Sequence, residues 1–201
     1  MKTGNRSRRT TLLGLLTAIL MVFGMTPLGY LNIGPLAISF NMIPVAIGAA
    51  ALGPVGGAIL GAVFGMTSFL QCLGIGGSSA MGVILFDINP LFAFIQRFVP
   101  RVMAGFLVGV IYQAARRFCK PGLAGSIAGF CAALLNTVLF MTALILLFGN
   151  TQYLTDLIAG RNVILFICTF VGVNAVAEAL ATTAVTGALT AALERSGLLR
   201  R

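Results

Sequence analysis

The chain has 201 residues, with 13 Lys and Arg against 4 Asp and Glu, and a net charge of +9. Hydrophobic residues make up 59% and charged residues 8%, whereas an average soluble domain has about 25% charged residues. So few charges cannot cover a soluble surface, which excludes soluble, disordered and disulfide-framework proteins and predicts a single integral membrane domain over residues 1–201.

Polar residues, Pro and Gly divide the chain into six apolar segments, each predicted to be a membrane helix, for which a bilayer requires about 20 residues. The second segment is short and contains Pro44, and a tight turn at Gly53-Pro54 leads into the third. The pattern predicts an all-α membrane protein, a bundle of six transmembrane helices. The segments are Thr11 to about Met25, about Ile38 to Leu52, Val55 to Leu73, Leu91 to about Ala115, Leu123 to Phe148, and Asn162 to Leu193.

The distribution of basic residues predicts that both termini are cytoplasmic, because Lys and Arg are enriched in cytoplasmic loops. With the N-terminus inside, Arg97, Arg101 and Arg161 fall in the outer half, and the connections on the outer side are the long ones. Long loops on one face are often functional, so we expect them to cap a ligand pocket that opens outward. The ten basic residues on the inner side are Lys2, Arg6, Arg8, Arg9, Arg116, Arg117, Lys120, Arg195, Arg200 and Arg201.

The basic residues before the first apolar segment are also typical of a cleaved signal peptide. No clean cleavage site of small residues follows that segment, so we favour a membrane helix.

Several chemistries are excluded by residues that the chain lacks or places elsewhere. It has no His, which excludes imidazole metal sites and Ser-His or Cys-His nucleophile pairs. Its two lysines, Lys2 and Lys120, lie outside any Gly-rich phosphate loop, so it cannot hydrolyse ATP by that route. We therefore expect no enzyme, no metal and no cofactor, and we interpret the positive charge as membrane orientation rather than nucleic-acid binding. The four cysteines are scattered without a CxxC spacing, namely Cys72, Cys119, Cys131 and Cys168.

Polar residues inside the apolar segments are costly in a bilayer and by default indicate a functional site. Five of them lie 13 to 17 residues from the cytoplasmic end of their helices, or roughly 20–26 Å at 1.5 Å per residue. They are therefore predicted to share one layer in the outer half of the membrane. These residues are Asn41, Gln71, Arg101, Asn136 and Glu178.

Two pairs of polar residues have the four-residue spacing that places both members on one helix face. Arg97 and Arg101 share a face, and so do Asn174 and Glu178. One interpretation is structural, with an Arg101–Glu178 ion pair and amides that satisfy the backbone. The other is a polar pocket in which at least one arginine receives a substrate anion, since guanidinium binds carboxylate through two parallel hydrogen bonds.

Small residues also recur every four positions, as at Gly57, Gly61 and Gly65. The pairs Gly105 and Gly109, and Gly125 and Gly129, repeat the spacing. Such ridges allow membrane helices to pack closely, and internal packing is the simplest interpretation.

Four stretches resemble the substrate-binding components of energy-coupling-factor (ECF) vitamin transporters, most closely the pantothenate-type branch. The resemblance covers most of the chain, and its most specific part is LGPVGGAILGAVFG at 52–65. The stretches are TPLGYLNIGPLAISFNMIPVAIGAAALGPVGGAILGAVFGMTSF, VPRVMAGFLVGVIY, LLNTVLF and NAVAEAL.

The resemblance implies a six-helix bundle with a vitamin pocket near the outer face of a bacterial plasma membrane. It also implies partners, a membrane coupling subunit and two ATP-binding-cassette ATPases. The family's first helix docks on the coupling subunit through an Ala-xxx-Ala face, which corresponds to Gly14 and Ala18 in this sequence. The implied mechanism is toppling, in which the loaded bundle rotates within the membrane.

Pantothenate is favoured as the vitamin because it is aliphatic and carries one carboxylate, an amide and two hydroxyls. The chain has no Trp, and the outer loops offer only Tyr30 and Tyr153 for stacking on a flat ring. Arg97 or Arg101 would meet the carboxylate. The amide and hydroxyls would meet Asn136, Asn174 or Gln71.

Three alternatives stay open. The first is a component for another small vitamin, of the folate, riboflavin, niacin or pyridoxine type. The second is an autonomous secondary carrier with Glu178 as its relay, and the third is a structural membrane protein whose buried charges only pair with one another.

Overall fold

The computed structural model describes residues 2–26, 29–33, 36–76, 79–158 and 163–197. Helices dominate, and one short β-hairpin follows the first helix. The elements in chain order are α1 (Lys2–Met25), β1 (Tyr30–Ile33), β2 (Leu36–Ser39), α2 (Met42–Leu52), α3 (Pro54–Leu70), the 3-10 turn η2 (Gln71–Leu73), α4 (Ala80–Ile88), α5 (Pro90–Ala115), α6 (Pro121–Phe148), α7 (Gln152–Ile158) and α8 (Val163–Arg195).

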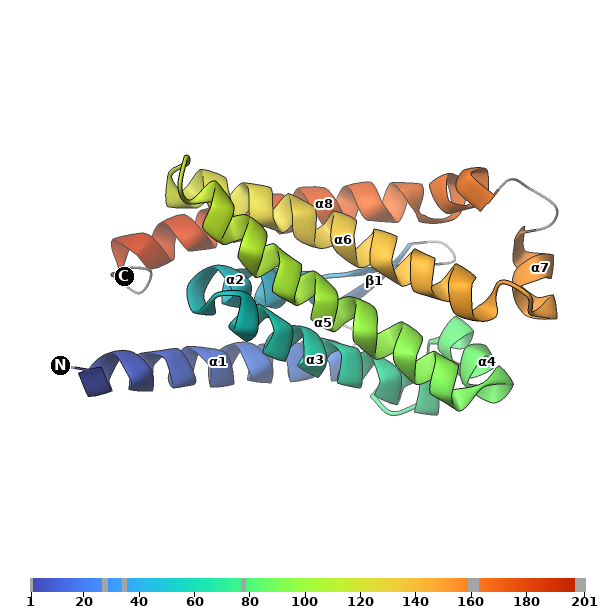
Figure 1. Cartoon of the computed structure of the whole chain (residues 1–201). Coiled ribbons are helices and arrows are strands. Elements are labelled where there is room, and N and C mark those ends of the chain that lie inside the picture. Colours follow the sequence, from blue (N-terminus) through green and yellow to red (C-terminus); the bar gives the residue numbers. More distant parts are fainter. Residues whose placement is uncertain (1, 27–28, 34–35, 77–78, 159–162, 198–201) are drawn as a thin grey trace.

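The long helices run along one common axis and form an elongated bundle (Figure 1). Both chain termini lie at one end, here called the terminal end, and α4 and α7 lie at the other, here called the loop end (Figure 1). Within the described residues, five helices are long and apolar enough to cross a membrane, and α2 is a shorter apolar helix. These five stretches are Ser7–Met25, Pro54–Leu73, Pro90–Ala115, Pro121–Phe148 and Ala175–Arg195.

Each of the six predicted apolar segments contains a helix, but the second begins later than expected. Ile38 belongs to β2, and the helix starts only at Met42. The protein is an α-helical membrane protein, as predicted, and it contains one hairpin that the sequence did not predict: β1 and β2 pair antiparallel, with Tyr30 opposite Ser39 and Ile33 opposite Leu36. A two-residue connection is sufficient for such a hairpin.

The long loops at the loop end contain two further short helices, α4 and α7, and side-chain caps mark the starts of α4 and of the long helix α5. Ser79 caps α4, since its Oγ accepts a hydrogen bond of 3.2 Å from the backbone amide of Gly82. Asn89 caps α5 in the same way, and its Oδ1 accepts from the amides of Leu91 and Phe92. Such caps satisfy backbone donors that a helix start leaves open.

Glycine contacts hold the helices close together, which confirms the small-residue interpretation. A side chain at Gly57 would collide with the Gly105 carbonyl, and one at Gly61 with the Arg101 carbonyl. Helices α3 and α5 therefore meet backbone to backbone. Helices α6 and α8 meet in the same manner, because a side chain at Gly129 would collide with the Thr182 carbonyl.

Helix α2 occupies the centre of the bundle and is packed by α1, α3, α5, α6 and α8. Its residues from Val45 to Ala50 are buried. With 11 residues it extends about 16 Å, which is about half of the hydrocarbon thickness of a bilayer. Beyond Met42, the first residue of α2, no further turn of this helix occupies the centre of the bundle.

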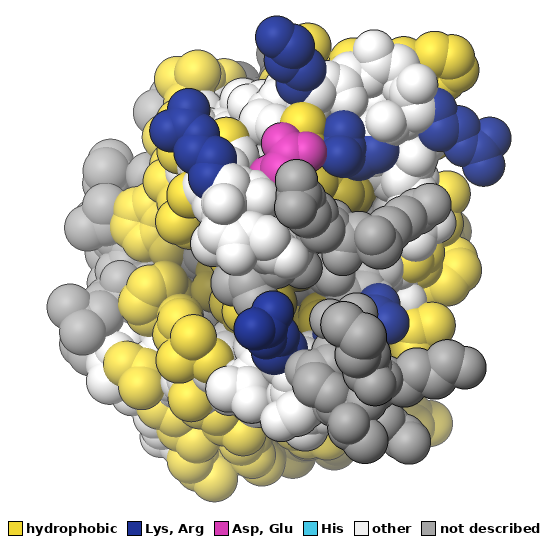
Figure 2. Space-filling model, turned by 90° about the vertical axis from the view of Figure 1, so that its left-hand side faces the viewer, with side chains coloured by type: hydrophobic (Ala, Val, Ile, Leu, Met, Phe, Trp, Pro, Cys, Tyr) yellow, Lys and Arg dark blue, Asp and Glu magenta, His cyan; other side chains and the backbone are white. Residues whose placement is uncertain are grey.

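The terminal end is strongly basic, and Lys and Arg side chains surround it with little acidic surface between them (Figure 2). Two contacts fasten helix ends to one another there. Arg9 Nη2 donates to the carbonyl of Leu52 at 3.2 Å. Arg116 Nη2 pairs with Glu194 Oε1, also at 3.2 Å, and so links α5 to α8.

Candidate functional site

The candidate site is a cluster of buried polar side chains beyond the N-terminal end of α2. Helix α5 contributes Gln96, which is fully buried, and Arg97 and Arg101, each only 6% exposed. Helix α8 contributes Glu178, which is 7% exposed. So many polar groups within apolar helices are expensive, which is why we regard the cluster as functional.

Arg97 is held by hydroxyl groups from two other elements. Its Nη1 donates to Ser68 Oγ of α3 at 3.4 Å, and its Nη2 donates to Ser79 Oγ at 3.2 Å. Helix α4 passes close above it, because a Cβ atom at Gly82 would lie 3.0 Å from Arg97 Nη2. The guanidinium therefore lies under α4, toward the loop end.

Arg101 is held mainly by its own helix and by an aromatic ring. Its Nη1 donates to the carbonyl of Arg97 at 2.7 Å, and its Cζ lies 4.6 Å from the centre of the Phe64 ring. Pro100 lacks an amide hydrogen and cannot bond the carbonyl of Gln96, so the backbone ladder of α5 is interrupted beside these polar residues.

Glu178 connects three other elements to α8. Its carboxylate lies among the backbone amide of Ser39, the side chain of Asn136 and the guanidinium of Arg101. Asn41 lies two residues after Ser39 in the chain, and its Nδ2 donates to Ser39 Oγ at 3.2 Å. The structure thus brings Asn41, Arg101, Asn136 and Glu178 into one region, as the layer prediction required.

Several buried polar atoms of the cluster have no hydrogen-bond partner among the described residues. A buried polar group left in this state costs about 1–3 kcal/mol. A polar ligand that supplies donors and acceptors would recover this cost. The atoms are Asn41 Oδ1, Gln96 Nε2 and Oε1, Asn136 Oδ1 and Glu178 Oε1.

The other predicted site residues have different positions. Gln71 Nε2 donates to the carbonyl of Gly24 at 2.7 Å, so its amide ties η2 to α1. Asn174 belongs to α8, but its side chain lies outside the described residues. Gly14 and Ala18 lie on the outward face of α1, and a Cβ atom added at Gly14 would meet no described atom within 4 Å.

Sequence reasoning missed the neighbours that orient the arginines. Gln96 could have been found by the rule used for the others, because it is a polar residue within an apolar helix. Ser68 and Ser79 carry no comparable signal, since serine is frequent in membrane helices and at helix starts. Phe64 and Phe140 look like ordinary apolar residues until the helices are packed.

The cluster can bind a polar, anionic molecule, and it offers little for catalysis. Over the described part of the chain, no three His, Cys, Asp or Glu side chains gather in a group that could hold a metal ion. Arginines and amides buried among membrane-length helices are typical of membrane proteins that bind or move polar solutes.

Comparison with known proteins identifies the family. Residues 8–190 match the family model of the ECF transporter substrate-specific component, so the chain belongs to that family. It is therefore a multi-pass membrane protein and a transporter component, which agrees with the prediction that it is not an enzyme.

Two curated relatives are pantothenate transporters. "Pantothenic acid transporter PanT" of Lactococcus lactis subsp. cremoris is 27% identical over 207 residues, which cover 96% of this chain and 98% of that protein. "Pantothenate transporter PanT" of Leuconostoc mesenteroides subsp. mesenteroides is 34% identical over 129 residues, which cover 62% of this chain and 58% of that protein.

Proposed function

We propose that this chain is the pantothenate-binding subunit of an ECF-type importer in a bacterial plasma membrane. The observation that carries this proposal is the pair of buried guanidinium groups on α5, surrounded by amides and hydroxyls. The names of both relatives support the same substrate.

The chemistry of pantothenate matches the groups of the cluster. Arg97 would receive the carboxylate, because guanidinium binds carboxylate through two charge-assisted hydrogen bonds and Ser68, Ser79 and α4 hold this arginine toward the loop end. Asn41, Gln96 and Asn136 present amide atoms that suit the amide and the two hydroxyls of the substrate.

The basic terminal end supports a cytoplasmic location for both termini. The loop end, with the polar cluster, would then face the outside. In this arrangement α2 would complete a sixth crossing together with β1 and β2. The buried helix α2 would also block a direct path from the site to the cytoplasm, which supports release by toppling of the whole bundle.

The energy for transport would come from partner subunits, namely a membrane coupling subunit and two ATP-binding-cassette ATPases. Family membership supports partners of this kind. The outward face of α1, with Gly14 and Ala18 at its centre, is the surface that we assign to the coupling subunit.

Titration calorimetry of the purified full chain in detergent tests the substrate. We expect pantothenate to bind, and the corresponding uncharged alcohol to bind more weakly. Arg97→Gln should weaken the binding of pantothenate about 30- to 1000-fold, because a charge-assisted bidentate contact contributes about 2–4 kcal/mol to binding. The same substitution should change the affinity of the alcohol little.

Three results would each contradict a different part of the proposal. If Arg97→Gln lowers the affinities for acid and alcohol equally, Arg97 does not bind the carboxylate, and Arg101 or a backbone site becomes the candidate. Binding of folate, riboflavin, niacin or pyridoxine in place of pantothenate would show that the proposed substrate is wrong, and it would leave the family assignment unchanged. Uptake that persists without coupling subunits would favour an autonomous carrier.

A further inference from the structure

One aromatic ring lies against both arginines of the site. The Cζ atom of Arg97 is 5.3 Å from the centre of the Phe140 ring, and that of Arg101 is 5.1 Å from it. Phe140 belongs to α6, whereas both arginines belong to α5. The ring is therefore a contact between helices that reaches both cations at once.

The physical role of such a ring follows from its charge distribution. The face of an aromatic ring is negative, and it attracts a cation within about 6 Å of its centre. Two guanidinium groups four residues apart repel each other, and they do so more strongly in a medium of low dielectric constant. A shared ring opposes this repulsion without occupying the hydrogen-bond donors that a carboxylate needs.

The described hydroxyl contacts of Arg97 are weak by comparison. Its donor–acceptor distances of 3.4 Å to Ser68 and 3.2 Å to Ser79 lie at the long end of the hydrogen-bond range. Arg101 has a second ring, Phe64, and a short bond of 2.7 Å to a carbonyl. Among the described ring contacts, Arg101 would keep Phe64 after the loss of Phe140.

We infer that Phe140 is a positioning residue for substrate recognition, which holds the Arg97 guanidinium in the orientation that binds the substrate carboxylate. The inference rests on the proposed function and adds a determinant of acid selectivity to it. The ring touches the arginines, and it acts on the substrate through them.

The test is the ratio of affinities for pantothenate and its alcohol, measured by calorimetry on the full chain. Phe140→Leu removes the ring and keeps an apolar side chain. It should weaken the binding of pantothenate about 5- to 30-fold and change the affinity for the alcohol by no more than about twofold. Phe140→Tyr keeps the ring face and should restore most of the selectivity for the acid.

Phe64→Leu is the matched control, since the described ring contact of Phe64 is with Arg101. It should leave the ratio of acid to alcohol affinity unchanged, even if it lowers stability. The inference is overturned if Phe140→Leu weakens acid and alcohol equally, because Phe140 would then only fill space. It is also overturned if Phe140→Tyr is as unselective as the leucine variant.

Failure of the proposed function has a different signature. A wild-type chain that binds acid and alcohol equally well would reject carboxylate recognition itself, and the role of Phe140 with it. A selective wild type whose selectivity survives Phe140→Leu would reject only the role of Phe140.

Discussion

Arg101 is a buried cation with a charged neighbour on another helix. Glu178 is among its neighbours, and each of the two side chains is more than nine-tenths buried. A buried charge that loses its opposite charge is left uncompensated in a medium of low dielectric constant. Arg101 and Glu178 should therefore matter for stability, whereas Arg97 should matter for the substrate.

We predict that Arg101→Gln destabilises the protein by about 3–5 kcal/mol and that a second change, Glu178→Gln, partly relieves the loss. The relief arises because neutral glutamine no longer leaves a buried charge uncompensated. Thermal unfolding of the purified variants measures the effect. Arg117→Gln, at an exposed position near the terminal end, is the control and should be neutral. A double variant less stable than Arg101→Gln would exclude charge coupling between the two residues.

Part of the site could be predicted at this scale, because the rise of a helix is fixed. Counting residues from the helix ends placed Arg101, Asn136 and Glu178 at one depth, and the structure brings them together. The count gives no information on helix rotation or on neighbours. It could not separate Gln71, which bonds to α1, from the cluster, or find Phe140 between the two arginines.

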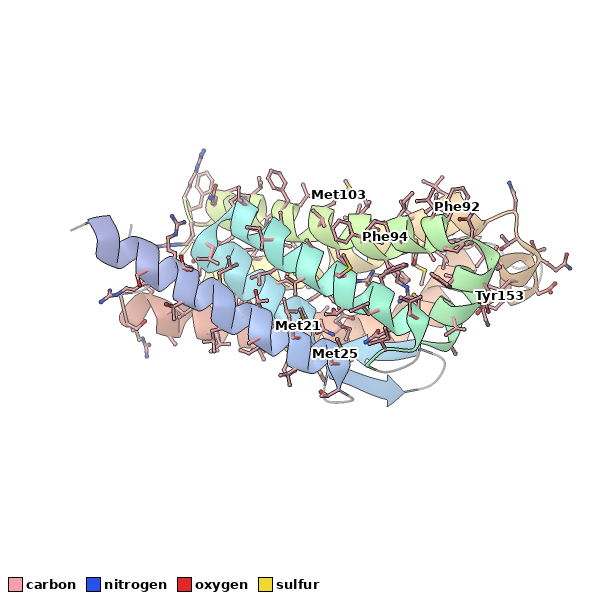
Figure 3. The ribbon with its side chains drawn as sticks, turned by 90° about the horizontal axis from the view of Figure 1, so that it is seen from below. Met21, Met25, Phe92, Phe94, Met103 and Tyr153 are labelled. Carbon is pink, nitrogen blue, oxygen red and sulfur yellow. The ribbon has the colours of Figure 1, made fainter. Side chains whose placement is uncertain are left out.

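Helix α1 lies at the edge of the bundle and has two distinct faces. Leu16 and Leu20 pack inward, and a side chain at Gly24 would collide with Thr67 of α3. The opposite face is exposed and continues through Met21 and Met25, which Figure 3 labels. Exposed apolar residues also occur elsewhere, as at Met103 of α5, so the small residues Gly14 and Ala18 distinguish this face.

We predict that Gly14→Leu and Ala18→Leu abolish uptake in cells that contain the coupling subunits, while calorimetry shows unchanged substrate binding. A close contact between membrane helices cannot absorb the added volume. A Cβ atom at position 14 would meet no described atom within 4 Å apart from its own helix backbone, so the fold should tolerate a leucine there.

The matched control is Ala184→Leu, which adds the same volume at an exposed position of α8. It should leave uptake normal. Normal uptake in both α1 variants would remove this face as the docking surface. Loss of substrate binding together with uptake would point to misfolding instead.

The elements themselves differ in how well the sequence predicts them. Apolar segments such as Leu123 to Phe148 identify long helices reliably, because only a regular helix can satisfy its backbone in lipid. The hairpin and α7 were missed, since their residues alternate little and lie among Gly, Pro and Asn. Helix α2 starts late because the hairpin occupies the residues before it, so its start could not be predicted without predicting the hairpin.

At the scale of the whole molecule, the orientation in the membrane rests on the basic terminal end. We predict that Asn150→Cys reacts with a membrane-impermeant thiol reagent added to intact cells, in a background without the native cysteines. Lys120→Cys, in the connection between α5 and α6, should react only after permeabilisation, because positive loops stay in the cytoplasm.

Both positions are at the ends of α6 or just beyond them, which makes them a matched pair. The reversed labelling pattern would invert the orientation and place the polar cluster in the cytoplasmic half. Labelling of both positions from outside would contradict an even number of crossings, because α6 would then not separate the two sides.

The short length of α2 has a consequence for how such a protein can evolve. Toward the terminal end, the helix α2 fills the centre of the bundle, and close packing of its Ala and Gly residues fixes its position. Beyond Asn41 the axis is built by side chains that reach inward from α5, α6 and α8. A single codon change replaces a side chain and leaves every helix in its place. A bundle of this design can therefore acquire a new cargo through a few substitutions, while its insertion into the membrane and its assembly with partners stay the same.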